Sequence, residues 1–472
     1  MKKFSNLVLC LALFIISGPA FSQLKPDNKS LKGSWMGKIP AGGIFLRVIF
    51  NIDVTANDSL TATLDSPDQG VKGIKTGVVT FDGKVLDIKA PVILGEYNGT
   101  IKSDTLIEGT WKQAGKVFDL NLTKLLHQFS LNRPQEPKAP YPYTSNDVSF
   151  RNEKADISLS GTLTIPEGSG PFPAVVLITG SGPQNRNEEL LGHKPFLVIA
   201  DWLSRNGIVV LRYDDRGIGK SQGIFSAATT ADFATDAAAA VSFLKTCSSV
   251  NPARIGLAGH SEGGLIAPIV AAGNKDIAFI ITLAGPGVIG EKILNRQNFD
   301  ISKAAGANEK DIKKGISANT EMFSIVKKEK DNSTATEKMI AAYSKLIDKE
   351  KLSSEDKSKA LNQLKSQTAT LTSPWFRYFL TLDPAPYWKK VSCPVLILNG
   401  EKDLQVAADV NPPAIVKALS SGGNKSYTVK ILPGLNHLFQ HSSSGAPSEY
   451  GNIEETFSPE VLRLMSDWIR AL

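Results

Sequence analysis

The sequence predicts an α/β domain with an inserted helical cap, preceded by a small all-β barrel or sandwich domain. Strand-like and helix-like segments alternate from residue 147 onward, which is typical of a parallel sheet covered by helices. A long helix-forming segment, 288–390, interrupts that alternation between two apolar strand-like runs. Residues 24–130, in contrast, contain short strand-like runs that are separated by turn residues. A length of 472 residues suits two or three such domains.

Composition and the first residues predict an exported globular protein. Hydrophobic residues make up 42% of the chain and charged residues 21%, which excludes a disordered chain. Residues 1–22 have the features of a signal peptide, because Lys2 and Lys3 precede an apolar run and a small-x-small cleavage site. That run is too short to span a bilayer, as is every later one, so we expect a periplasmic or extracellular protein that is not transmembrane. A lipid anchor at Cys10 is the alternative.

The charged residues and cysteines exclude several other classes of site. The formal net charge is +7, but no zinc-finger spacing, RNP-like run or dense arginine cluster indicates a nucleic-acid partner. The chain has five histidines and no cysteine cluster, so we expect no metal site. Cys247 and Cys393 could form a disulfide in an exported protein, although a packed thiol suits Cys393 equally well.

The all-β segment 24–130 opens and closes with similar sequences, Gly-Ser-Trp at 33–35 and Gly-Thr-Trp at 109–111. Strand-like runs lie between them at 44–50, 78–81 and 85–88, and another follows at 117–122. Such a barrel can bind an apolar ligand, but we expect an interior filled by its own side chains and no chemistry. Residues 131–146 carry four prolines and are predicted to form an extended linker.

Residues 147–472 carry the pattern of a mostly parallel sheet. An alternating strand at 157–163 precedes a continuous apolar run at 174–178, as a sheet covered on both faces requires. Further strands are expected at 208–213, 254–258, 277–284, 394–399 and 427–432. The inserted segment 288–390 is rich in Lys, Glu, Ala and Ser and ends near an aromatic run at 375–380. We interpret it as a helical cap that roofs one edge of the sheet.

Ser261 is the candidate nucleophile, because it lies in a G-x-S-x-G sequence between a strand and a helix. That context is typical of a nucleophile elbow, where the serine Oγ projects from the carboxyl end of the sheet. The following backbone N–H, that of Glu262, then faces an oxyanion at the positive end of the helix. A second match around Ser221 lies past its strand and precedes no helix, so we interpret it as a turn.

The acid and the base should follow Ser261 in the order acid, then histidine. Asp403 lies just after the strand at 394–399 and is the predicted acid, with Glu401 as the alternative. His437 lies just after the strand at 427–432 and is the predicted base, with His441 as the alternative. Both loops are expected at the same edge of the sheet as Ser261.

An oxyanion hole needs a second N–H group besides that of Glu262. The loop after the strand at 174–178 has the expected position, with Ser181 predicted as donor and Gly182 as the alternative. These parts predict a serine hydrolase that cleaves a small-molecule, short-acyl ester through an acyl-enzyme, without a cofactor. The alternatives are an aminopeptidase or other amide hydrolase with the same triad, and a non-catalytic binding protein whose functional unit is the β domain.

Residues 150–472 resemble the α/β-hydrolase family, in particular its exported bacterial carboxylesterases, with relatives among the serine aminopeptidases. The resemblance implies Ser261, Asp403 and His437 as the catalytic triad. It also implies that residues 214–221 hold the loop beside the site. Thr179 stands where the histidine of one form of the oxyanion motif would be. The motifs that carry the resemblance are Gly180-Ser181-Gly182-Pro183, Asp214-Asp215-Arg216-Gly217-Ile218-Gly219-Lys220-Ser221, Gly259-His260-Ser261-Glu262-Gly263-Gly264, Gly400-Glu401-Lys402-Asp403-Leu404-Gln405-Val406 and Gly434-Leu435-Asn436-His437.

Overall fold

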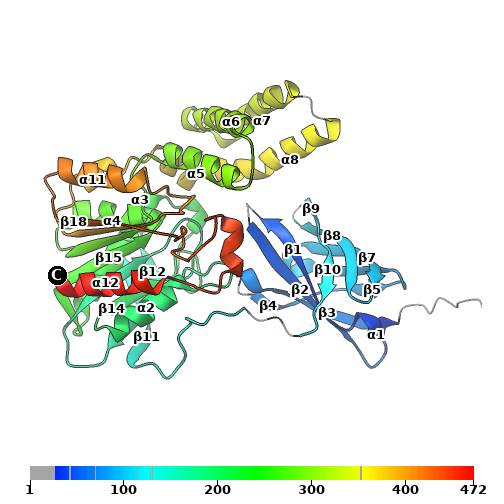
Figure 1. Ribbon diagram of the computed structural model, residues 1–472, viewed down its shortest axis with the longest axis horizontal. Helices are drawn as coiled ribbons and strands as arrows, with labels where there is room; N and C mark the ends of the chain where they lie inside the picture. Colours follow the sequence, from blue (N-terminus) through cyan, green and yellow to red (C-terminus); the bar gives the residue numbers. More distant parts are fainter. Residues whose placement is uncertain are drawn as a thin grey trace, which may run out of the picture. The chain divides into compact units, whose positions relative to one another are not determined.

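The computed structural model describes residues 27–41, 44–69, 71–113, 115–127, 129, 131–350 and 353–472 (Figure 1). The expected signal peptide, residues 1–22, and Cys10 lie outside the described residues. The chain forms two compact units. The first contains most of the chain up to Phe129, and the second contains Ser130–Leu472 together with Pro40–Leu46 and Pro67–Val71.

The first unit is a curled antiparallel sheet in the strand order β4-β3-β2-β1-β10-β8-β7-β6-β5, with β9 paired to β8. Its interior is filled as expected, because the rings of Trp35, Phe50, Tyr97 and Trp111 are each less than 2% exposed. The two tryptophans come from the two similar Gly-x-Trp sequences. The strands are β1 (Gly33–Ala41), β2 (Ile44–Val54), β3 (Leu60–Ser66), β4 (Val71–Lys75), β5 (Val79–Phe81), β6 (Val85–Ala90), β7 (Gly95–Ser103), β8 (Leu106–Gln113), β9 (Lys116–Asp119) and β10 (Leu122–Lys124).

The second unit is built on an eight-stranded sheet in the order β11-β12-β14-β13-β15-β16-β17-β18. The first two strands are antiparallel to their neighbours, and the six from β14 to β18 run parallel. Strand order and direction therefore match the predicted α/β fold. The strands are β11 (Tyr143–Asn152), β12 (Ile157–Pro166), β13 (Phe172–Ile178), β14 (Val209–Tyr213), β15 (Val250–His260), β16 (Phe279–Leu283), β17 (Val395–Gly400) and β18 (Tyr427–Leu432).

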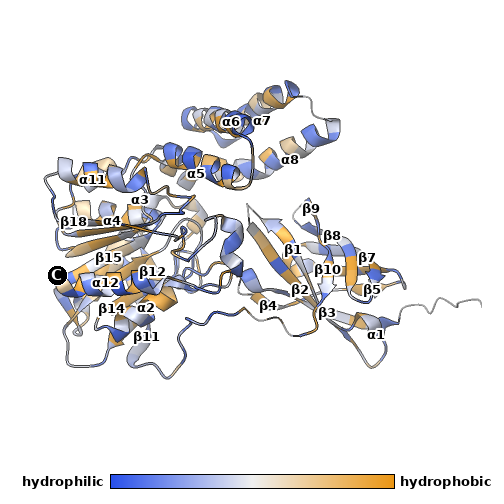
Figure 2. Ribbon diagram, viewed as in Figure 1, coloured by the Kyte–Doolittle hydropathy of each residue, from blue (hydrophilic) through white to orange (hydrophobic). Residues whose placement is uncertain are grey.

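Helices cover both faces of this sheet (Figure 1). Helices α3 (Thr230–Thr246), α4 (Glu262–Gly273) and α11 (Asn411–Ser421) lie on one face, and α2 (Pro195–Arg205) and α12 (Pro459–Ala471) on the other. Successive residues of β13 serve the two cores in turn, since Val176 packs with α3 and α4 while Leu177 packs with α2 and α12. The central strands are consequently mostly apolar, as Figure 2 shows.

The described residues between β16 and β17, where the cap is predicted, form six helices. Side chains of Asn308, Asp331, Ser353 and Ser373 each accept a hydrogen bond from a first-turn N–H and so define where a helix starts. The helices have a small core of their own around Phe323, Met339 and other apolar residues. They are α5 (Gly290–Ala304), α6 (Glu309–Lys328), α7 (Asn332–Asp348), α8 (Ser354–Leu371), α9 (Pro374–Thr381) and α10 (Ala385–Trp388).

The proline-rich segment 131–146 is fixed to the second unit by its polar side chains. The guanidinium group of Arg133 donates hydrogen bonds of 3.0–3.3 Å to the backbone carbonyls of Leu191, Gly192, Gly451 and Ile453. The amide of Gln135 accepts from two further backbone N–H groups, at Thr456 and Phe457. The segment then enters the sheet at Tyr143 as β11.

Cys247 and Cys393 are both free thiols and are half-buried. Burial raises the pKa of both thiols, and that of Cys393 reaches about 11. No helix within the described part of the chain combines the length and the apolar character that a membrane span requires.

Candidate active site

Ser261 lies at the sharp turn between β15 and α4. Its backbone has φ 51° and ψ −117°, a conformation that a residue with a side chain rarely adopts and that concentrates at functional sites. The turn is fixed by a 2.8 Å hydrogen bond from the Ser261 N–H to the carbonyl of Leu283. A Cβ atom at Gly259 would collide with the carbonyl of Gly263, and one at Gly263 with that of Ile178. The G-x-S-x-G spacing is therefore a steric requirement of this turn.

His437 and Asp403 form a buried hydrogen-bonded pair. His437 Nδ1 lies 2.8 Å from Asp403 Oδ2, and each residue is 4% exposed. Asp403 Oδ1 accepts 2.8 Å hydrogen bonds from the backbone N–H groups of Gln405 and Val406, which fix the carboxylate in its loop. Because Nδ1 donates to the carboxylate, Nε2 of His437 is left to act as a base. Ser261 and His437 both line one pocket.

The alternatives Glu401 and His441 take other positions. Glu401 is exposed, and its carboxylate accepts a hydrogen bond of 2.9 Å from the backbone N–H of Gly434. His441 is also exposed and forms an ion pair with Glu455 at 2.9 Å. Neither residue is among those that line the pocket. The geometry therefore brings together Ser261, Asp403 and His437 and leaves the two alternatives outside.

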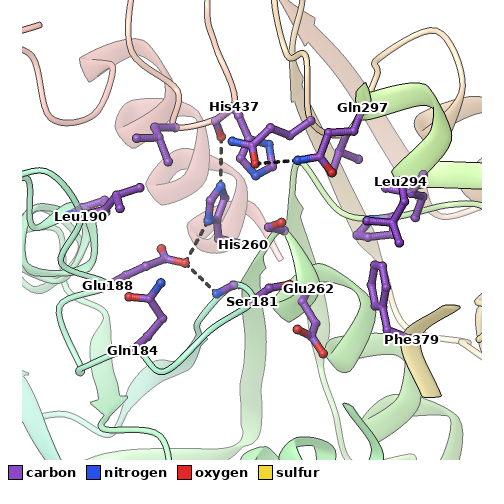
Figure 3. Close-up of a pocket in the computed structure, with 18 of the residues that line it drawn as sticks. Ser181, Gln184, Glu188, Leu190, His260, Glu262, Leu294, Gln297, Phe379 and His437 are labelled. Atoms are coloured by element: carbon purple, nitrogen blue, oxygen red, sulfur yellow. Dashed lines mark hydrogen bonds and ion pairs between the residues drawn. The ribbon is translucent and has the colours of Figure 1, made fainter. Parts of the chain in front are cut away.

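The two predicted oxyanion donors, Ser181 and Glu262, both line the pocket (Figure 3). Among the residues that the structure describes, neither backbone N–H donates to a protein acceptor, so both are available to a ligand. Gly182, the alternative donor, has φ +99° and is absent from the lining of this pocket. The geometry favours Ser181, because Gly180 before it lies so near Ser261 that an added Cβ would come within 3.2 Å of the Cβ of Ser261.

Buried carboxylates hold the loop that carries Ser181. Asp215 accepts hydrogen bonds from Thr179 Oγ1 at 2.8 Å and from the Gln184 N–H at 2.9 Å. The carboxylate of Asp214 accepts hydrogen bonds from the backbone N–H of Arg186 and from its guanidinium group. Thr179 therefore joins the loop to the end of β14, which is the role that the resemblance implies for residues 214–221.

The side chain of Glu262 links the cap to the elbow. Its buried carboxylate accepts hydrogen bonds from Thr230 Oγ1 at 2.7 Å and from Trp375 Nε1 at 2.8 and 3.0 Å. Burial raises the pKa of Glu262, and these hydrogen bonds, with one from Ser181, oppose that rise. Trp375 belongs to α9, so the cap is anchored at the residue that follows Ser261.

The pocket has a volume of about 290 Å³ and two kinds of wall. The cap supplies an apolar wall of Ile293, Leu294, Trp375 and Phe379, and Figure 3 shows Leu294 and Phe379 on one side of the site. The polar part of the wall includes Gln297 and Gln405, and Gln297 donates a 3.3 Å hydrogen bond to Gln405. The cap therefore lies over the Ser261 edge of the sheet, as expected from where it leaves the sheet.

Within the described chain, no three His, Cys, Asp or Glu residues lie close enough together to hold a metal ion.

Sequence reasoning missed Glu188, which is buried beside Ser181 (Figure 3). Its carboxylate accepts a 2.7 Å hydrogen bond from the Gly180 N–H. Glu188 lies in a polar loop sequence with no motif around it, and its burial comes entirely from tertiary contacts. No sequence signal therefore identifies Glu188 as a residue of the site.

Comparison with known proteins finds similarity to hydrolases. Residues 194–345 match the Hydrolase_4 family model, described as serine aminopeptidase, S33. Esterase EstD of Thermotoga maritima is 28% identical over 324 residues, which cover 66% of this chain and 67% of that protein. The second unit therefore has an α/β-hydrolase fold. The uncharacterized protein YfhR of Escherichia coli K12 is 30% identical over 138 residues, or 29% of this chain and 45% of YfhR.

Two solved structures are also similar to this chain. The α/β hydrolase GrgF from Penicillium sp. sh18 is 20% identical with a TM-score of 0.43, and the match covers 70% of this chain and 98% of GrgF. The esterase Pf2001 of Pyrococcus furiosus is 15% identical with a TM-score of 0.40, over 70% of this chain and 93% of that one.

Proposed function

We propose that this α/β hydrolase cleaves carboxylic esters of small or short-acyl substrates through an acyl-enzyme at Ser261. The observation that carries the proposal is the buried hydrogen bond between Asp403 and His437, with His437 in the same pocket as a serine on a strained elbow. Similarity to an esterase and to a hydrolase family supports ester hydrolysis as the reaction class.

The proposed reaction proceeds in two halves. His437 accepts the proton of Ser261 Oγ as that oxygen attacks the ester carbonyl, and Asp403 stabilises the resulting imidazolium. The N–H groups of Ser181 and Glu262 donate to the oxyanion, and the alcohol leaves with the proton from His437. Water then attacks the acyl-enzyme with His437 as base, which releases the acid and restores Ser261.

The pocket favours a short acyl group. A volume of about 290 Å³ lies at the small end of the range for ligand sites, and the cap closes its apolar wall. A long acyl chain would therefore have to displace side chains such as Leu294 and Phe379. We expect turnover to fall as the acyl chain lengthens.

An amide hydrolase with the same triad is the second candidate, because the matching family model is a serine aminopeptidase. An aminopeptidase needs a carboxylate for the substrate's ammonium group. The two carboxylates that line the pocket are already engaged, Glu188 by His260 and Gly180, and Glu262 by Thr230 and Trp375. Ester hydrolysis therefore remains the stronger proposal.

The deciding experiment compares p-nitrophenyl esters of increasing acyl length with aminoacyl p-nitroanilides on the purified protein. We expect the acetate and butyrate esters to be the best substrates and the anilides to be poor. Ser261→Ala and His437→Ala should abolish turnover, and His441→Ala should leave it unchanged. Ester turnover that survives in Ser261→Ala would refute the proposal, and faster anilide cleavage would favour the amide hydrolase.

We also propose that the protein is exported, on the basis of residues 1–22. Expression of the full sequence in a bacterial host, followed by cell fractionation, tests this. The mature protein should leave the cytoplasm and begin at Gln23. An uncleaved cytoplasmic product would contradict the proposal.

A further inference from the structure

His260, the residue before the nucleophile, is clamped between two other parts of the active site. Its ring is 7% exposed. Nδ1 lies 2.9 Å from Glu188 Oε1, and Nε2 lies 3.0 Å from the backbone carbonyl oxygen of His437 (Figure 3). Both ring nitrogens of His260 therefore contact groups other than the Ser261 hydroxyl, and the ring takes no direct part in the proposed reaction.

Both partners of the His260 ring are hydrogen-bond acceptors. A neutral imidazole has one N–H donor and one acceptor nitrogen, so it can satisfy only one of these contacts. An imidazolium donates from both nitrogens and satisfies both. Glu188 Oε1 also accepts from the Gly180 N–H at 2.7 Å, which suits an ionised carboxylate. The geometry therefore corresponds to a buried ion pair with a proton on each ring nitrogen.

The groups around the ring agree with that charge. Glu188 faces it from the oxyanion loop, Asp403 from the loop after β17, and His437 and Phe439 from the loop after β18. Burial alone would lower the pKa of His260, but the carboxylate of Glu188, the His437 carbonyl and the charge of Asp403 together raise it.

The ion pair between His260 and Glu188 connects three loops whose relative positions must be fixed for catalysis. Glu188 holds the Gly180 N–H next to Ser181, and a Cβ at Gly180 would press on both Glu188 and the Cβ of Ser261. Glu188 itself has a φ of 51°, so its position is maintained by these contacts against backbone strain. On the other side, His260 holds the main chain of His437.

We propose that a protonated His260, paired with Glu188, is a positioning residue that fixes the oxyanion loop and the His437 loop around Ser261. This inference rests on the proposed function. The two rings lie 4.8 Å apart between centroids, so the His260 ring also packs beside the ring of the base that it positions.

Steady-state kinetics test the proposal with His260→Gln and Glu188→Gln. Loss of these contacts should reduce kcat/KM with short esters by about 10- to 100-fold in both variants. The loss should fall mainly on kcat, because the groups that would be misplaced, the Ser181 N–H and His437, act on the transition state. The matched control is His441→Gln, which removes an exposed His–Glu pair and should leave kcat and KM unchanged. A wild-type rate, or a loss that falls on KM alone, would overturn the proposal.

A second measurement does not depend on activity. Nitrogen NMR of the full chain with ¹⁵N-labelled histidine, which has only five such residues, reports how many ring nitrogens carry protons. We expect one histidine to be doubly protonated at pH 7, and its signal to be missing from His260→Gln. A neutral His260 at pH 7 would refute the ion pair. If Ser261→Ala kept its activity, the proposed function would fail while this result still stood.

Discussion

At the scale of single residues, the environment of Asp403 separates it from its neighbour Glu401. One oxygen of Asp403 is occupied by two loop N–H groups and the other faces His437. Asp403→Asn would present the wrong partner to the ring and remove the charge that stabilises its cation. We expect kcat to fall by about 10⁴-fold, as for the same change in a serine protease triad.

The control for that variant is Glu401→Gln. Glu401 is exposed and holds only a backbone N–H of a neighbouring loop, so its replacement should cost less than a factor of about three, within the range expected for surface changes. Steady-state kinetics with p-nitrophenyl acetate on both variants make the comparison. Equal losses, or a larger loss for Glu401→Gln, would move the acid to Glu401.

Asp215 should make stability depend on pH. Burial raises its pKa to about 7, against two hydrogen bonds that favour the ionised form. The folded chain then keeps a proton that the unfolded chain releases above its ordinary pKa of 3.8. The free energy of unfolding therefore falls as pH rises from about 4 to about 7 and levels off above.

Denaturant unfolding of the wild type and of Asp215→Asn at pH values from 5 to 9 measures this effect. The decline with pH should be shallower in Asp215→Asn, since the variant has no proton to lose at that position. Glu262 and His260 also have raised pKa values and remain in both proteins, so the difference between the two curves isolates Asp215. Parallel curves would contradict the prediction.

At the scale of elements, the cap and the elbow meet through one hydrogen-bonded pair, the indole of Trp375 and the carboxylate of Glu262. Trp375→Phe leaves that buried carboxylate with fewer donors, which should destabilise the fold by about 1–3 kcal/mol. With α9 less firmly held, the preference for short acyl chains should also weaken. Thermal unfolding and the rate ratio of octanoate to acetate esters measure the two effects.

Trp388→Phe is the matched control for the cap. Trp388 is also buried, on α10, but its Nε1 has no hydrogen-bond partner among the described residues. The control removes the same atoms without breaking a hydrogen bond, so acyl preference should not change. If both variants altered the preference equally, loss of packing rather than the Glu262 contact would be the cause.

The predictable elements are those whose own sequence carries a periodic or motif signal. Apolar runs such as 174–178 allowed the central strands to be predicted, and the glycines around Ser261 allowed the elbow to be predicted. By contrast, β4 (Val71–Lys75) was not predicted, because its residues are largely exposed and include a glycine. Glu188 and Arg133 were missed for another reason, since their roles depend on partners 8 to more than 300 positions away.

At the scale of the whole molecule, every residue that lines the pocket falls between Gly180 and Thr456, within the second unit. A fragment of residues 131–472 should therefore keep its activity on short esters. A fragment of residues 143–472 should be less stable, because it lacks Arg133 and its hydrogen bonds to four carbonyls. Melting temperatures and acetate hydrolysis of the two fragments test this. Loss of activity in the longer fragment would give the β domain a role in the chemistry.

The two free thiols have a consequence for where this protein can be made. Burial keeps Cys247 and Cys393 protonated, and a protonated thiol is slow to exchange or oxidise. The fold therefore needs no disulfide-forming system on either side of a bacterial membrane. We expect equal melting temperatures for protein produced in a reducing cytosol and in an oxidising periplasm, with no change on adding a reductant. Cysteine content is thus no guide to the compartment in which this protein works.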